Sequence, residues 1–407
     1  MNLPLRRWLQ LAFFNLMLVA FLGIVLRIKI VFSLPFIDQK YLLHGHSHFA
    51  FTGWISQVLM ALLLAWLGNT AGSDYFKKYR WLLYANLFTA YGMLISFPLQ
   101  GYGIFSISFS TLSIIVSYIF GFRFWKDLNK LPVAATSHRW FKMAVFLNAL
   151  SSLGVFTLAF MMATKHIHHK VYLAAVYFYL HFQYNGWFFF ACMGLLSAQL
   201  SRFGAKESSL QTVYRLFAWA CLPAYFLSAL WLPLPFWVYL LIVLSVFLQL
   251  GAWWWLLRLF KPLAAQIRAG IPPVAQRVLL LAAIALSIKL CLQAGSVIPS
   301  LSTLAFGFRP IVIGYLHLVL LGIITLFITG YCIAMQYISP NKAVLAGVAV
   351  FVGGILLNEL LLMVQGIADL SYHGIPFINQ LLLLAAFVLF AGIAIINYGI
   401  STKKQAP

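Results

Sequence analysis

Histidine is the residue type in this sequence with the most obvious chemical use. The chain has ten histidines but only six Asp and Glu together, so carboxylates cannot be the general partners of the imidazoles. Three histidines lie in H-G-H-S-H at 44–48, one lies in H-F-Q-Y-N-G-W at 181–187, and one lies in Y-L-H-L-V-L-L-G at 315–322. Imidazole is the commonest metal ligand in proteins. The first hypothesis is therefore a bound metal or haem.

Helical spacing divides the first group of histidines between two faces. His44 and His48 are four residues apart and share one face, whereas His46 points roughly the opposite way. All three are candidate ligands for haem or a metal, with His44 and His48 on one side of the helix and His46 on the other. The position at which this helix begins decides which of the three lies deepest in a membrane.

The other two segments supply further candidates. His181 is a candidate metal ligand, and Tyr184 follows it by one turn as a candidate proton donor. His317 is a candidate ligand for either haem iron or copper. Arg309 begins the same expected helix and suits a haem propionate, because guanidinium binds carboxylates through two hydrogen bonds.

Each of these residues also has a structural interpretation. A single histidine in a membrane helix often makes a hydrogen bond to a neighbouring helix, and H-G-H-S-H at a membrane interface could simply be hydrated. Ionisable residues inside membranes are nevertheless costly and usually functional. The occurrence of imidazole on three helices favours a haem or metal site. Phe, Tyr and Trp make up 17% of the chain and could wall a porphyrin.

Composition indicates which elements must position these residues. Of 407 residues, 63% are hydrophobic and only 8% are charged, and the mean hydropathy is +0.95. Soluble domains carry roughly 25% charged residues, so the chain is expected to be an all-α integral membrane protein. Apolar runs of about 20 residues occur along the whole chain. A helix of that length crosses about 30 Å of hydrocarbon.

The sequence predicts about twelve transmembrane helices in a single polytopic membrane domain over 1–407. The expected spans are 9–34, 43–68, 81–99, 103–122, 141–164, 171–199, 213–231, 234–257, 276–297, 309–336, 342–364 and 375–399.

Charge distribution predicts the orientation of these spans. Most of the 27 Lys and Arg fall in the N-terminus, the C-terminus and the even-numbered connections. The positive-inside rule then puts both termini in the cytoplasm and the protein in the inner (cytoplasmic) membrane. Anionic lipid headgroups account for the formal charge of +21, so we expect the lipid bilayer and no nucleic acid as a partner.

With these residues in view, the chain resembles a divergent haem-copper oxidase catalytic subunit or an NnrS-type haem-copper membrane protein. G-H-S-H-F-A-F-T-G-W at 45–54 is similar to the H-x-H and Gly-Trp segment of C-type oxidases, nitric oxide reductases and NnrS proteins. The resemblance implies an oxidase-like helix bundle with haem and copper. It implies that His44 or His48 and His317 hold haem iron, and that His181 holds copper.

The ligand set of the oxidases is incomplete in this chain. Span 213–231 lacks the adjacent His-His pair, and the tenth span has His317 alone where oxidases have two histidines. Three functions therefore remain open. The first is electron transfer or O2 or NO chemistry at haem, with a redox partner or a diatomic gas as ligand. The second is a non-catalytic haem or copper sensor, carrier or accessory protein. The third is a twelve-helix secondary transporter.

Overall fold

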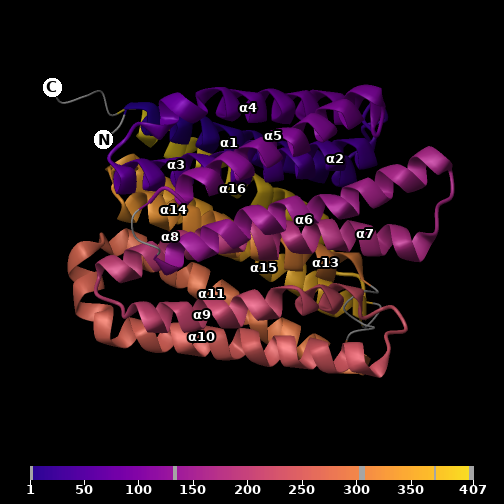
Figure 1. Cartoon of the computed structure of the whole chain (residues 1–407). Helices are drawn as coiled ribbons and strands as arrows, with labels where there is room; N and C mark the ends of the chain where they lie inside the picture. Colours follow the sequence, from indigo (N-terminus) through magenta and orange to yellow (C-terminus); the bar gives the residue numbers. More distant parts are fainter. Residues whose placement is uncertain (1–2, 132–134, 302–307, 371–372, 403–407) are drawn as a thin grey trace. The chain divides into compact units, whose positions relative to one another are not determined.

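The computed structural model describes residues 3–131, 135–301, 308–370 and 373–402, and all regular secondary structure in these ranges is helical (Figure 1). Within the same ranges, ten helices are long and apolar enough to cross a membrane. The expected all-α class is thus confirmed for this part of the chain. The count of twelve spans and the oxidase-like arrangement remain predictions.

Two of the expected spans are missing from those ten helices. The span expected at 171–199 coincides with the helical run α7 (His169–His181), η2 (Phe182–Phe188) and α8 (Phe189–Arg202), whose centre carries polar side chains. The span expected at 213–231 coincides with α9 (Glu207–Cys221), which has only 15 residues before the 3-10 helix η3 (Pro223–Ala229). Polarity lowers the hydropathy of the first, and the change of helix type shortens the second.

The chain divides into two compact units, which we describe separately. The first unit contains residues up to Phe120 and from Thr329 onwards, and the second contains Gly121–Ile328. The first unit includes α1 (Leu3–Val31), α2 (Gln39–Phe49), η1 (Ala50–Ser56), α3 (Gln57–Ala71), α4 (Tyr75–Gln100), most of α5 (Ile104–Leu128), the greater part of α14 (Leu326–Ala334), α15 (Lys342–Leu370) and α16 (Ile378–Ser401).

In the first unit, α16 packs against both α15 and α1, while α2 and α3 pack against α4. Hydrogen bonds bring several helix ends together at one end of the unit. Arg6 Nη2 donates to the Ile400 carbonyl at 3.1 Å, and Asn341 Nδ2 donates to the Gly399 carbonyl at 2.8 Å. The start of α1, the start of α15 and the end of α16 therefore lie together. The start of α2 lies near the turn between α4 and α5, because the Tyr41 ring contacts Gly101.

The second unit is built around α6 (Thr136–Thr164), which packs against α7, η2 and α8. Helix α9 packs against α10 (Phe236–Gly270), and α11 (Pro273–Ser296) packs against η4 (Leu318–Thr325), which follows α13 (Arg309–His317). The backbone N–H of Thr136 donates to the Glu207 side chain, so the starts of α6 and α9 lie at the same end of this unit.

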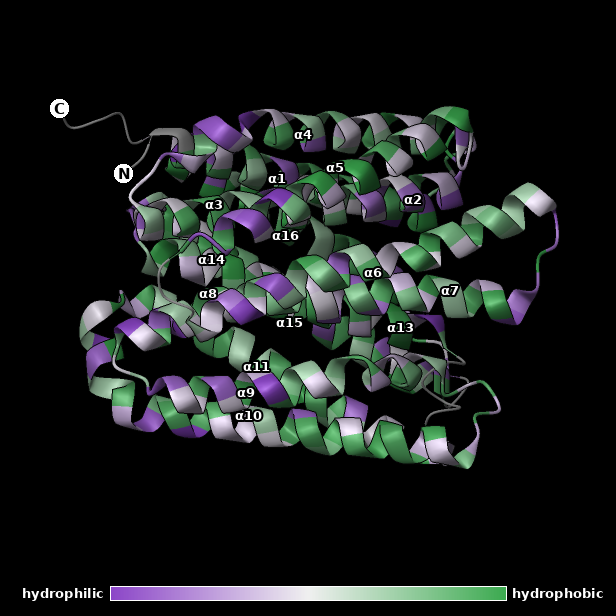
Figure 2. Cartoon of the chain, in the orientation of Figure 1, coloured by the Kyte–Doolittle hydropathy of each residue, from purple (hydrophilic) through white to green (hydrophobic). Residues whose placement is uncertain are grey.

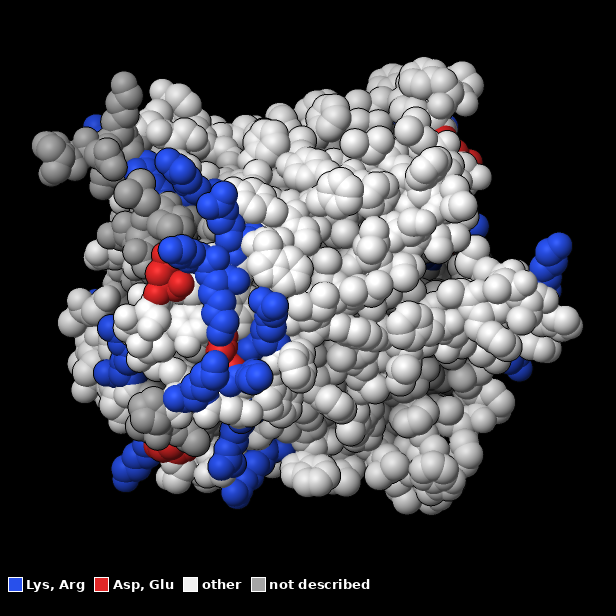
Figure 3. All heavy atoms as spheres, turned by 45° about the horizontal axis from the view of Figure 1, so that its top comes forward, with Lys and Arg blue, Asp and Glu red and all other residues white. Residues whose placement is uncertain are grey.

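The surfaces of the helices are those of membrane segments. Large apolar side chains point outward, including Phe88 at 64% exposure and Leu99 at 78%. Figure 2 shows that apolar residues predominate along the helices. Figure 3 shows most of the visible Lys and Arg side chains gathered in a band on one side, with a few at the opposite edge and a large uncharged surface between them. Lipid is the environment in which such uncharged apolar surfaces are stable.

Candidate functional site

The three histidine segments share a backbone feature. In each, an α-helix changes into a π-helix one or two residues after a histidine: η1 begins two residues after His48, whereas η2 and η4 begin at the residues after His181 and His317. π-Helical turns are rare and frequently occur at functional sites. The backbone thus marks one histidine in each segment, and in the first segment it marks His48 rather than His44 or His46.

A short sequence repeat accompanies these transitions. H-F-A-F-T-G-W at 48–54 and H-F-Q-Y-N-G-W at 181–187 agree at His, Phe, Gly and Trp, and H-L-V-L-L-G-I at 317–323 keeps the His and the Gly. Trp54 and Trp187 are both buried. Comparing the histidine segments with one another, rather than one at a time, would have revealed this repeat in the sequence alone.

In the first unit, His44 and His48 form an aromatic cluster with Phe97 and Tyr102, which we call the first cluster. The His48 ring stacks on Phe97 with centroids 4.3 Å apart and planes at 11°. The His44 ring meets the edge of Tyr102 at 4.7 Å. The structure therefore brings His44 and His48 together on one face of α2, as their spacing predicted.

The depth of this cluster depends on where α2 begins. Asp38 caps the helix by accepting a hydrogen bond from the Tyr41 N–H at 2.8 Å, so α2 starts at Gln39, four residues earlier than expected. At 1.5 Å per residue, His48 then lies roughly 14 Å into the helix.

Gly45 allows the close approach of α2 and α4 that forms the first cluster. A Cβ atom at Gly45 would lie 2.9 Å from the ring of Pro98, which is the residue after Phe97. The approach buries His44 Nε2, and this nitrogen has no hydrogen-bond partner among the described residues. An unsatisfied buried polar atom costs about 1–3 kcal/mol, so His44 Nε2 is a candidate position for a ligand.

His46 lies on another side of α2. A Cβ atom at Gly23 would be 3.7 Å from His46 Cε1, which places His46 next to α1 and away from Phe97. The opposite orientation predicted from helical spacing is thus observed. His46 does not share a site with His44 and His48.

Buried amide side chains support the π-helix η1. Asn15 Nδ2 donates to the Gly53 carbonyl at 2.6 Å, and the Tyr91 hydroxyl donates to Asn15 Oδ1 at 2.6 Å. Asn86 Nδ2 donates to the Thr52 carbonyl at 3.0 Å. Because a π-helix shifts the usual backbone pairing, these side chains satisfy its carbonyls and hold it in place.

In the second unit, His181 belongs to a different kind of cluster, formed with Asn185 and Cys221, which we call the second cluster. His181 Nε2 lies 2.9 Å from the Cys221 carbonyl, and Asn185 Nδ2 lies 3.2 Å from His181 Nδ1. A carbonyl can only accept, so Nε2 carries the proton and donates, while Nδ1 accepts from Asn185. Both ring nitrogens are therefore engaged, and His181 fits a structural role better than the predicted copper ligation.

The Cys221 carbonyl needs this hydrogen bond. Cys221 ends α9, and the chain continues through Pro223 into the 3-10 helix η3, where the Tyr225 N–H donates to Leu222 and not to Cys221. The ring of His181 thus satisfies a carbonyl that the change of helix type leaves without its usual i+4 donor. Lys289, which is 4% exposed, also interacts electrostatically with His181 and Cys221.

His317 has the hydrogen bonding expected of a ligand. Its Nδ1 lies 2.8 Å from the Ile313 carbonyl one turn earlier, so Nδ1 carries the proton and Nε2 carries the lone pair. Histidines that bind metals almost always donate their second nitrogen to a carbonyl or carboxylate in this way. Of His181 and His317, His317 is thus the better ligand candidate.

Tyr184 is buried in η2, 4% exposed, and its ring meets the edge of Tyr315 with centroids 6.4 Å apart. Tyr315 precedes His317 by two residues in the sequence. The structure therefore places Tyr184 against the helix segment that carries His317. Arg309 is exposed at the start of α13.

Within either unit, the described residues contain no group of three His, Cys, Asp or Glu side chains close enough to hold a metal ion. The predicted copper ligands His46, His181 and His317 accordingly form no such group within a unit.

No known family model matches this chain, and no curated protein is significantly similar to it in sequence.

Proposed function

We propose that the chain is a haem-binding membrane protein that works in electron transfer or in the chemistry of a diatomic gas, O2 or NO. The observation that supports it best is the buried His44 Nε2, a ring nitrogen without a partner among the described residues, on the same helix face as His48. His317, with its lone pair on Nε2, is the ligand candidate of the second unit.

The residues fit haem better than a copper ion held by protein alone. Copper bound by side chains needs about three ligands, and neither unit offers such a group in its described part. Haem needs only one or two protein ligands, because the porphyrin supplies the others. When bound, haem would supply an iron that changes oxidation state or takes up a gas molecule.

The protein residues would then have separate roles. His44 or His48 and His317 are the candidate iron ligands. The rings of Phe97 and Tyr102 pack beside His44 and His48 and would provide aromatic walls for the haem. Arg309 suits a propionate, and Tyr184 suits proton donation near His317. Copper stays a secondary candidate at His46, and His181 is assigned to holding η2 against the end of α9.

The incomplete copper ligand set favours electron transfer or gas sensing over the reduction of oxygen at a haem-copper pair. The relationship to haem-copper oxidases and NnrS proteins is part of the proposal, because its support is the similarity of short histidine-containing segments. We also place both termini in the cytoplasm, on the basis of the positive-inside rule.

The test is a dithionite-reduced minus air-oxidised absorption spectrum of the purified protein in detergent, followed by carbon monoxide. Haem bands that shift with carbon monoxide would support gas chemistry or sensing. Haem bands that do not shift would support a six-coordinate electron carrier. A featureless spectrum from a host that supplies haem would reject the haem proposal and leave the histidines as copper ligands or structural groups, with the transporter hypothesis still open.

A pair of variants tests the ligand assignment. We expect His317→Ala to lose most of the Soret band. We expect His166→Ala to keep it, because His166 is exposed and its ring bonds to the nearby Thr164 carbonyl. Equal retention in both variants would remove His317 from the site.

A further inference from the structure

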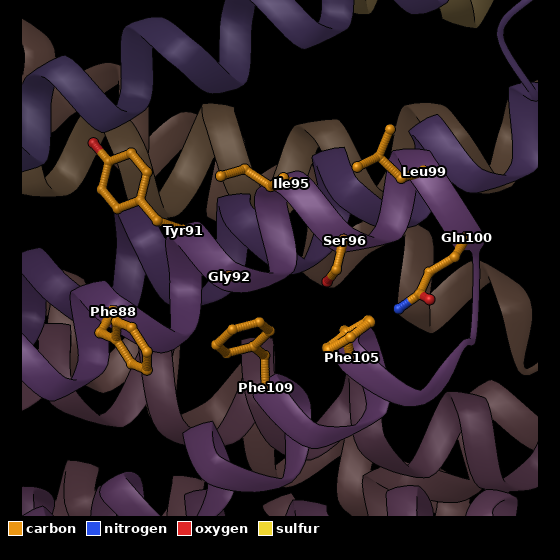
Figure 4. A pocket seen from close by; sticks show the side chains of 9 residues that line it. All are labelled: Phe88, Tyr91, Gly92, Ile95, Ser96, Leu99, Gln100, Phe105 and Phe109. Carbon is orange, nitrogen blue, oxygen red and sulfur yellow. The ribbon is translucent and has the colours of Figure 1, made fainter.

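A groove of about 600 Å³ lies between α4 and α5 in the first unit. Figure 4 shows Phe105 and Phe109 of α5 facing α4 across it. Phe109 packs directly on Gly92, where a Cβ atom would lie 2.3 Å from the Phe ring. Ile95 and Leu99 on the rim are 61% and 78% exposed. Since α4 and α5 are both candidate membrane spans, the groove opens towards lipid.

Gln100 and Ser96 both contribute polar side chains to the lining of this groove, and Ser96 is the more deeply buried of the two. Ser96 is 7% exposed, and its hydroxyl is buried with no hydrogen-bond partner among the described residues. Helical Ser and Thr side chains elsewhere in the unit bond back to their own helix, as Thr52 does to His48 and Thr111 to Ile107. Figure 4 shows the Ser96 hydroxyl directed into the space between α4 and the α5 rings. A donor is thus aimed into an apolar groove with nothing to receive it.

The lining determines what kind of head group fits. None of the nine residues that line the groove is charged, so a phosphate or carboxylate head would have no cation beside it. A neutral head with a carbonyl oxygen would accept the hydrogen bond of Ser96. The rings of Phe105 and Phe109 would contact a flat head group through offset or edge-to-face packing.

The length of the groove determines the tail. Its lining on α4 extends from Phe88 to Gln100, which is about 18 Å at 1.5 Å per residue. Ser96 lies near one end of this range. A single apolar chain of isoprenoid or acyl type would fill the remaining length towards Phe88.

We propose that the groove between α4 and α5 binds a membrane quinone, with a ring carbonyl on the Ser96 hydroxyl and the isoprenoid tail towards Phe88. A neutral tailed ligand follows from the groove alone. The choice of a redox-active head rests on the proposed function, since Phe97, the residue after Ser96, stacks on His48.

Binding is tested on the full-length protein in detergent with decylubiquinone as the probe, by quenching of tryptophan fluorescence. We expect Ser96→Ala to weaken binding about five- to tenfold through the loss of one hydrogen bond. Ser96→Leu should abolish it by filling the groove. Ser117→Ala is the matched control on α5, because the Ser117 hydroxyl bonds to Ile114 of its own helix, and it should bind as the parent does.

Three outcomes would overturn the proposal. These are no saturable binding to the parent protein, equal binding by all three variants, and displacement of the probe by dioctanoylglycerol at equal concentration, which would assign the groove to a neutral acyl lipid. The haem spectrum of the same preparation separates the two proposals. Quinone binding without haem bands would reject the proposed function alone, and haem bands without quinone binding would reject the groove alone.

Discussion

The first and second clusters are both built on histidines at an α-to-π transition, yet they differ in what the ring nitrogens do. In the first cluster, His44 and His48 contact aromatic rings, and His44 Nε2 has no hydrogen-bond partner among the described residues. In the second cluster, His181 donates to one neighbour and accepts from another. A buried histidine with both nitrogens satisfied holds the fold together. One with an unsatisfied nitrogen is open to a ligand.

The largest expected effect separates the clusters by haem content. We expect the double variant His44→Ala/His48→Ala to lose bound haem at least about tenfold, since even changes around a ligand commonly cost 10- to 100-fold in affinity. His181→Ala should retain haem in the fraction that folds. The measurement is the pyridine haemochrome content per folded protein. Loss in His181→Ala alone would reverse the assignment of the two clusters.

For the free energy of unfolding, we expect the variant in the second cluster to lose more than the variant in the first cluster. We expect His181→Ala to lower the free energy of unfolding by about 1–3 kcal/mol, because it removes an interhelical hydrogen bond worth roughly 0.6–1.7 kcal/mol and leaves the Cys221 carbonyl unsatisfied. In haem-free protein, His44→Ala should cost less than about 1 kcal/mol, because its Nε2 makes no hydrogen bond to lose. Thermal unfolding in detergent checks both, and equal losses would contradict the distinction.

The close contact between α2 and α4 at Gly45 should affect the stability and haem binding of the first cluster and not the second cluster. We expect Gly45→Ala to destabilise by about 1–3 kcal/mol through overpacking against Pro98 and to weaken haem binding. Gly353→Ala on α15 is the control, because a Cβ atom there meets nothing within 4 Å, and alanine is favoured over glycine in helices. If both variants behaved alike, close contact at Gly45 would not be what forms the cluster.

The smallest expected effect concerns the support of η1. Tyr91→Phe removes the hydrogen bond to Asn15 Oδ1, and we expect a loss of about 0.6–1.7 kcal/mol in the free energy of unfolding. Tyr84→Phe, at a side chain that is 54% exposed, should change it by less. Hydrogen exchange at residues 50–56 should rise only in the Tyr91 variant, and an unchanged exchange rate would show that η1 does not depend on this network.

Much of the fold was predictable because the membrane imposes a simple rule. Apolar stretches of about 20 residues must form helices to satisfy their backbones in lipid, so every expected span coincides with helical structure. The differences have local causes. The Asp38 cap moved the start of α2, and the polar centre of 169–202 and the short α9 leave ten helices among the described residues that are long and apolar enough to cross a membrane.

The sequence by itself determined the helical class, the shared face of His44 and His48, the opposite direction of His46 and the repeat around His48 and His181, because these depend only on composition and helical period. Only the tertiary structure decided what each ring nitrogen contacts. Gly45 against Pro98 buries His44 Nε2 without a partner, whereas the end of α9 presents a carbonyl to His181. Hydrogen bonds between helices depend on which helix ends meet, and spacing along the chain does not contain that information.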